Sequence, residues 1–131
     1  TLGLVLKEQG DLRGAKAAYE KALSLDDSLS TAHNNLGVVF YALHDRKGAK
    51  RHYMRAIALD PDRASAYYNL GQLFRDEGKW QKAAEQYAKA VEKRPSYAAA
   101  HDELANALMQ LGRESEAMAH FRIATELDPT L

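Results

Sequence analysis

Apolar residues recur at helical spacing in short segments separated by polar and turn-forming residues. Leu36, Val39 and Phe40 belong to one such segment, and Leu70 and Leu73 belong to another. Residues three or four positions apart fall on one face of an α-helix. Each segment therefore predicts an amphipathic helix whose apolar stripe packs against a neighbouring helix.

The pattern of packing residues repeats every 34 residues along the whole chain. It contains a leucine, an alanine, an aromatic residue and a closing proline, in that order. The residues that coincide are Leu2, Leu36, Leu70 and Leu104; Ala15, Ala49, Ala83 and Ala117; Tyr19, Tyr53, Tyr87 and Phe121; and Pro61, Pro95 and Pro129. A repeated unit of this length predicts a stack of helix pairs.

Glycines mark two kinds of place in each unit. Gly37 and Gly71 lie where a side chain would hold two helices apart. A second set, Gly10, Gly78 and Gly112, falls between the two helices of a unit, where a residue with positive φ ends the first helix at little cost. His44 takes that place in the second unit, which predicts strain or a different turn there.

This pattern of Leu-Gly or Leu-Ala followed by alanine, an aromatic residue, alanine and proline resembles the tetratricopeptide repeat (TPR). The resemblance covers one array of four repeats, at residues 1–29 (truncated), 30–63, 64–97 and 98–131. It implies an all-α fold, a right-handed superhelical solenoid of stacked antiparallel helix pairs, with eight helices in all. Because the chain starts at Thr1 inside a predicted helix, we expect it to be a fragment of a longer protein.

Composition narrows the range of functions. The 18 basic and 18 acidic residues cancel, which argues against a general nucleic-acid binder. The absence of cysteine excludes disulfides and thiolate chemistry, and it fits cytoplasm and periplasm alike. No apolar run is long enough to predict insertion into a membrane.

The histidines are the main material for a catalytic or metal site. His33 and His101 occupy equivalent positions two repeats apart, as do His52 and His120. At a helix spacing of 8–10 Å, about 20 Å separates the members of each equivalent pair, so they cannot share a metal ion. No known catalytic or phosphate-binding motif is present. We therefore expect no catalysis, no metal and no cofactor.

The resemblance implies that the first helices of the repeats line a concave groove, where partners of this family bind. Polar and aromatic residues occupy these positions and differ between repeats, whereas the packing residues recur. The predicted peptide-binding residues are Asn34, Asn35, Tyr41, Tyr68, Asn69, Gln72, Arg75, Asp102 and Asn106. We expect the amides to bond a peptide backbone, Tyr41 to provide contact area and Arg75 to pair with an acidic side chain.

Two binding modes of the family can be compared with this sequence. Asn35 and Asn69 share one groove position in adjacent repeats, which resembles the asparagine ladder of O-linked N-acetylglucosamine transferases. Solvated asparagines remain the alternative. The dicarboxylate clamp for chaperone tails is disfavoured, because Val38, Ala99 and Glu103 stand where Asn, Lys and Arg would be needed.

Two other surfaces stand out in the sequence. Arg46, Lys47, Lys50, Arg51 and Arg55 concentrate positive charge on one second helix, either as a solvated face or as a site for an acidic partner. Near the C-terminus, Phe121, Ala124 and Leu127 should be partly uncovered. Further repeats or end-to-end self-association would cover them.

The sequence thus predicts a protein-binding scaffold without enzymatic activity, whose ligand is a peptide segment of a partner protein. Two alternatives stay open. The chain could be the targeting arm of a larger enzyme such as a glycosyltransferase, or it could be a structural, self-associating component of an assembly.

Overall fold

The computed structural model describes residues 2–26 and 29–130, with side chains described from residue 10 onward. All regular secondary structure in these ranges is α-helical. The helices are α1 (Leu2–Leu25), α2 (Ser30–Ala42), α3 (Arg46–Leu59), α4 (Ala64–Asp76), α5 (Trp80–Lys93), α6 (Ala98–Gln110) and α7 (Glu114–Leu127).

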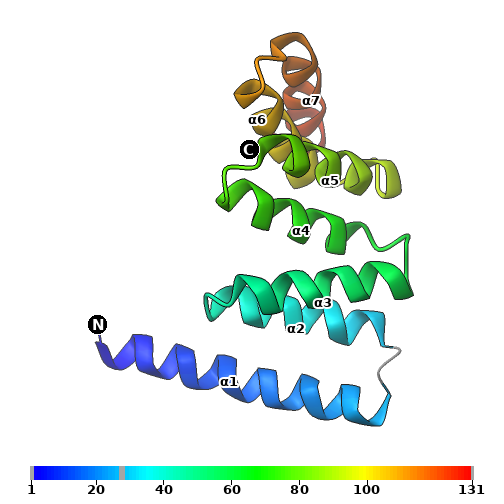
Figure 1. Ribbon diagram of the computed structural model, residues 1–131. Helices are drawn as coiled ribbons and strands as arrows, with labels where there is room; N and C mark the ends of the chain where they lie inside the picture. The colour runs from blue at the N-terminus through cyan, green and yellow to red at the C-terminus, as the bar shows by residue number, and fades with distance from the viewer. Residues whose placement is uncertain (1, 27–28, 131) are drawn as a thin grey trace. The chain divides into compact units, whose positions relative to one another are not determined.

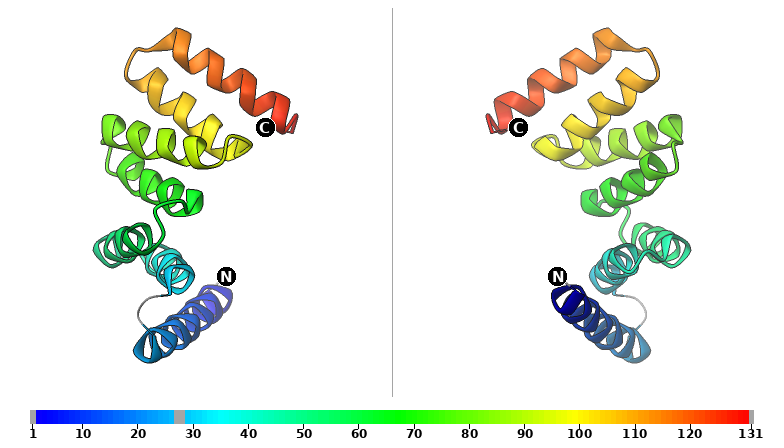
Figure 2. Two further views of the ribbon diagram at one scale, coloured as in Figure 1. Left: turned by 90° about the vertical axis from the view of Figure 1, so that its right-hand side faces the viewer. Right: turned by 90° about the vertical axis from the view of Figure 1, so that its left-hand side faces the viewer.

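The chain divides into two compact units, residues 1–61 and 62–131. In the first unit α1 packs against α2, and α2 packs against α3. In the second unit α4 pairs with α5, α5 contacts α6, and α6 pairs with α7. The partners α6 and α7 run antiparallel, which both views of Figure 2 show. Each unit thus has the helix hairpins that the repeat pattern predicts.

The prediction of a turn at Gly10 is wrong. Figure 1 shows α1 as one uninterrupted helix through this position, so the described residues contain seven helices instead of eight. Residues on both sides of Gly10 belong to the same helix, which continues to Leu25. Glycine permits a turn but does not require one, so the two predicted helices form a single helix.

The other predicted turns are confirmed. Gly78 and Gly112 have φ angles of +74° and +76°, and His44 adopts the same left-handed conformation at +66°. The Asp45 side chain accepts a hydrogen bond from the Gly48 N–H at 3.0 Å and so caps α3. This cap follows the unusual His44 turn directly and fixes the start of the second helix.

The packing role of the repeated glycines is also confirmed, and the structure identifies the residue that requires them. A Cβ on Gly37 would lie 2.5 Å from the Tyr53 ring, and one on Gly71 would lie 2.7 Å from the Tyr87 ring. Both tyrosines are buried. Tyr53 of α3 therefore rests on Gly37 of α2, and Tyr87 of α5 rests on Gly71 of α4.

The outer side of α7 only partly matches its prediction. Phe121 is half-buried and Leu127 is exposed, as expected, but Ala124 is buried. Ala124 occupies the repeated alanine position that faces the partner helix within the hairpin, so α6 covers it. None of the described helices is long and apolar enough to cross a membrane.

Candidate functional site

The predicted groove residues of the second unit meet at an ion pair between two first helices. Arg75 on α4 donates to the Glu103 carboxylate on α6 at 2.8 Å and to the Gln72 amide oxygen at 3.1 Å. It also pairs with Asp76 at 3.2 Å. Glu103 was not among the predicted binding residues. Its contact with Arg75 places one predicted residue of α4 beside α6.

This ion pair changes the expected role of Arg75. The prediction had Arg75 pairing with an acidic side chain of a ligand, yet the chain supplies these carboxylates itself. A guanidinium held by Glu103 and Asp76 is already neutralised and hydrogen-bonded. Arg75 thus links α4 to α6, and its pairing with an acidic side chain of a ligand stays a prediction.

Aromatic rings border the ion pair. The Tyr68 ring lies 5.1 Å from the Tyr97 ring and 5.8 Å from the Tyr87 ring, measured between centroids. Burial raises the pKa of Tyr68, and the nearby Glu103 and Tyr97 raise it further. Tyr68 is thus a neutral aromatic side chain, half-buried and held in place by two others. It can offer contact area to a ligand at little entropic cost.

The hydroxyl group of Tyr87 has no hydrogen-bond partner among the described residues, although it is buried. Burial raises the pKa of this phenol strongly, and the nearby Glu103 adds to the effect. A buried hydroxyl without a partner costs about 1–3 kcal/mol. The ring that carries this hydroxyl lies against the Tyr68 ring.

The surface formed by α4 and α6 is acidic. Arg75 pairs with Asp76 and Glu103, and Asp102 directly precedes Glu103 on α6. Burial raises the pKa of Asp102, and the adjacent Glu103 raises it further, so this carboxylate lacks a compensating cation. A basic side chain of a ligand would supply that cation.

The other predicted residues lie at different depths. In the second unit Asn69 and Gln72 are half-buried and Asn106 is exposed; in the first unit Asn35 and Tyr41 are half-buried. Asn34 does not fit its prediction, because only 7% of it is exposed. Because Asn35 and Asn69 belong to different units, the asparagine ladder stays a prediction.

Sequence reasoning missed two pairs of histidines that each join the helices of one hairpin. His33 Nδ1 lies 3.1 Å from His52 Nδ1, and His101 Nδ1 lies 3.0 Å from His120 Nδ1. The rings are stacked, with centroids 5.3 Å apart in both pairs. The sequence contained a signal for these pairs. Two histidines 19 positions apart occur once, and the same spacing occurs again 68 positions later.

Hydrogen bonding assigns the proton in the second pair. His101 Nε2 lies 2.9 Å from the Pro95 carbonyl oxygen, which can only accept, so Nε2 carries the hydrogen. In the neutral ring Nδ1 is then an acceptor, and His120 Nδ1–H donates to it. Burial lowers the pKa of His120, and the charge on His101 would lower it further. No group of three metal-binding side chains occurs in the part of the chain that the structure describes.

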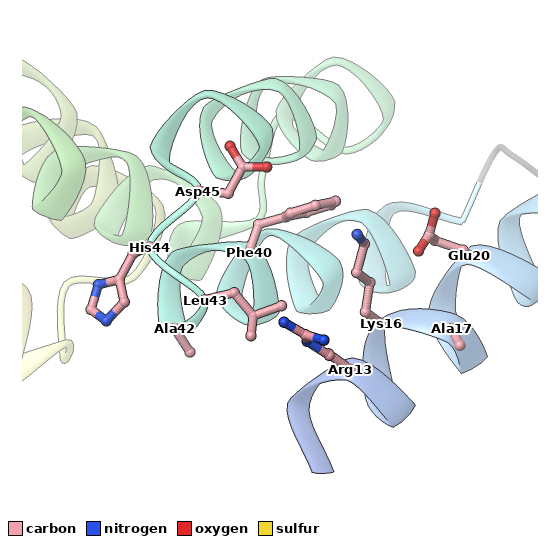
Figure 3. A pocket seen from close by; sticks show the side chains of 9 residues that line it. All are labelled: Arg13, Lys16, Ala17, Glu20, Phe40, Ala42, Leu43, His44 and Asp45. Carbon is pink, nitrogen blue, oxygen red and sulfur yellow. The ribbon is translucent and has the colours of Figure 1, made fainter. Parts of the chain in front are cut away.

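Two surface hollows flank the first histidine pair. One, of about 550 Å³, lies between α1 and the end of α2 (Figure 3). Here the Lys16 ammonium lies 4.8 Å from the Phe40 ring centroid, and Phe40 stacks on His52 with centroids 5.2 Å apart. The hollow carries both charge signs, with Arg13, Lys16, Glu20 and Asp45 in its lining. We find no single ligand chemistry that this mixture favours.

The second hollow, which we name the α3 pocket, has a volume of about 460 Å³. It lies on the surface of α3 and has a lining of one charge sign. Its residues are His33, Arg51, His52, Met54, Arg55 and Ala58.

Comparison with known proteins agrees with the repeat pattern. Family models described as tetratricopeptide repeat match residues 28–96 and 68–131, and one described as TPR repeat matches residues 3–43. No curated protein sequence matches the chain. Because one model spans more than half of the chain, the protein belongs to the tetratricopeptide repeat family.

Solved structures of MamA proteins are similar to this chain. One MamA crystal structure is 29% identical with a TM-score of 0.81, covering 98% of this chain and 70% of that one. A MamA RS-1 double mutant is 26% identical with the same TM-score, covering 98% and 72%. MamA MSR-1, at 21% identity and a TM-score of 0.74, shows the fold alone; the match covers 98% of this chain and 74% of that one. Together these findings show an all-α TPR solenoid and support a protein–protein interaction scaffold.

Proposed function

We propose that the surface of α4 and α6 in residues 62–131 binds an extended segment of a partner protein. The observation that carries this proposal is the Arg75–Glu103 ion pair, at 2.8 Å, which joins the predicted binding residue Arg75 of one repeat to α6 of the next. The Gln72 amide accepts a hydrogen bond from Arg75, the Tyr68 ring lies near the pair, and Asn69 follows Tyr68 on α4. This combination of a fixed aromatic side chain and bifunctional amides suits a peptide backbone.

The charges on this surface favour a segment with a lysine or arginine. Burial and the adjacent Glu103 raise the pKa of Asp102, whereas Arg75 pairs with Glu103 and Asp76. A basic side chain placed against Asp102 would form a charge-assisted hydrogen bond.

A peptide-display selection on the chain tests this function. The comparison variant is N69A/Q72A, and the matched control is Q81A, which removes an exposed amide from α5. We expect a motif with a basic residue on the parent chain and on Q81A. Binding of that motif to N69A/Q72A should be about tenfold weaker, since two hydrogen bonds of about 0.5–1.5 kcal/mol each are lost. Equal enrichment on all three chains would contradict the proposal.

The exposed face of α7 supports a second role, self-association. Met118 is 58% exposed, and a hollow of about 340 Å³ lies beside it, lined by Met118, Phe121, Arg122, Thr125 and Glu126. A second copy could cover this apolar surface. The average molecular mass of the parent chain in solution should rise with protein concentration, and that of M118E should rise less. A constant monomer mass would exclude this role.

A further inference from the structure

The helix α3 differs from the other second helices in its charge. Residues 46–59 contain five basic residues and no acidic residue: Arg46, Lys47, Lys50, Arg51 and Arg55. At the positions of Arg51 and Arg55, the other hairpins have Glu85 and Lys89 in α5, and Ala119 and Ile123 in α7. The positive face is thus specific to α3 and is not part of the repeat pattern.

Two of these arginines line the α3 pocket. Arg51 and Arg55 are four positions apart, so they lie on one face of α3, about one helical turn from each other. Both are exposed. The His33–His52 pair forms the adjoining part of the pocket, and it adds a positive charge when it binds a proton. Four nitrogen-bearing side chains thus surround one hollow.

Neither arginine is neutralised by the chain itself. Within residues 2–26 and 29–130, no carboxylate forms an ion pair with Arg51 or Arg55, whereas Arg75 and Arg113 both have such partners. Glu20 and Asp45 are the acidic groups close enough to act on His52. The guanidinium groups therefore keep their donors available for an external acceptor.

Apolar atoms complete the pocket. Met54 is 53% exposed and lies on the same face as Ala58. A small inorganic anion would leave this surface uncovered. Single-stranded nucleic acids are bound by stacking of their bases on aromatic side chains. The pocket has no aromatic side chain besides the histidines.

We propose that the α3 pocket binds an acidic segment of a partner protein, independently of the surface on α4 and α6. Carboxylates of the segment pair with Arg51 and Arg55, whose planar guanidinium groups match carboxylates in bidentate geometry. An apolar side chain of the same segment covers Met54 and Ala58. Such a ligand would contact both the positive charge and the apolar surface of the pocket.

Fluorescence anisotropy with a short labelled peptide of glutamate, alanine and leucine tests the proposal. The peptide with glutamine in place of glutamate controls for apolar binding. The variant R51Q/R55Q removes the pocket charges, and R46Q/K47Q removes two charges from the same helix outside the pocket. We expect R51Q/R55Q to weaken binding about tenfold, the equivalent of about 1.4 kcal/mol, and R46Q/K47Q to change it about twofold.

All four substituted residues are exposed, so we expect both variants to fold. Circular dichroism of each variant is the control for folding. Equal losses in the two variants would overturn the proposal, since binding would then depend on general charge. Binding of anionic phospholipid vesicles or inorganic phosphate without binding of the acidic peptide would also overturn it. Loss of acidic-peptide binding in N69A/Q72A would place the ligand on α4 and α6 instead.

Discussion

The two histidine pairs have the same geometry in different electrostatic surroundings. In each pair the Nδ1 atoms lie 3.0–3.1 Å apart and the planes of the rings differ by 25–27°. Beside His52 lie Arg51 and Arg55. Beside His120 the equivalent positions hold Ala119 and Ile123, and Glu116 lies in the adjoining hollow.

This difference separates what the repeat dictates from what it leaves free. The pair joins the two helices of a hairpin, so its geometry follows from helix packing and recurs wherever both histidines are present. Arg51 and Ala119, which directly precede His52 and His120, are exposed and take no part in that contact. Substitution there can change charge without a cost in stability, and binding specificity can arise at those positions.

The largest expected effect comes from removing the buried member of a pair. His101→Ala deletes the contact with His120 and leaves the Pro95 carbonyl without its donor. We expect a loss of about 2–4 kcal/mol in the free energy of unfolding, measured with urea. His33→Ala should show a similar loss. A change as small as that of the exposed-residue control Gln110→Ala would mean that the pairs do not hold the hairpins together.

A smaller effect is expected from acid. Burial and the facing histidine lower the pKa of both His52 and His120 below the ordinary value of 6.5. The unfolded chain then binds protons first as the pH falls. Stability is therefore complete above about pH 6.5 and is lost as the pH falls through the folded-state pKa values.

Urea unfolding at several pH values measures this dependence, with H52Q/H120Q as the comparison. The variant has no titrating pair, so its free energy of unfolding should change less between about pH 7.5 and about pH 5. Parallel curves for the parent chain and the variant would assign the acid sensitivity to other groups.

The smallest expected effects are pKa changes caused by the neighbouring charges. They distinguish the two histidine pairs most clearly, because they have opposite signs. Arg51 lowers the pKa of His52, whereas Glu116 raises that of His120. R51Q should therefore raise the pKa of His52, and E116Q should lower the pKa of His120, as followed by NMR titration of the ring protons. Changes of the same sign in both variants would show that the neighbouring charges do not distinguish the two pairs.

Much of the fold could be predicted because the packing residues recur. Gly37 and Gly71 were recognised as sites of close helix approach, and the left-handed turns at Gly78 and Gly112 were placed correctly. The turn at Gly10 was not, because a glycine permits a turn without requiring one. Packing of a second helix against the first is needed to enforce the turn, and α1 instead continues as one helix from Leu2 to Leu25.

The candidate site could be predicted only in outline. The surface on α4 and α6 was placed by its register, but the pairing of Arg75 with Glu103 was not foreseen, since it joins residues 28 positions apart. Asn34 was assigned to the groove although it is buried. Adjacent helical positions differ by about 100°, so a small rotation of the helix decides whether such a residue faces a ligand or the interior.

By itself the sequence determined the repeat, the helix pairs, the residues at their contacts and the charge of α3, since all of these depend on local spacing and composition. Only the tertiary structure decided which distant side chains meet: His33 with His52, His101 with His120, and Arg75 with Glu103. Such contacts depend on the relative rotation and offset of two packed helices. A few degrees or ångströms there separate a hydrogen bond from two solvated groups, and no single helix encodes that difference.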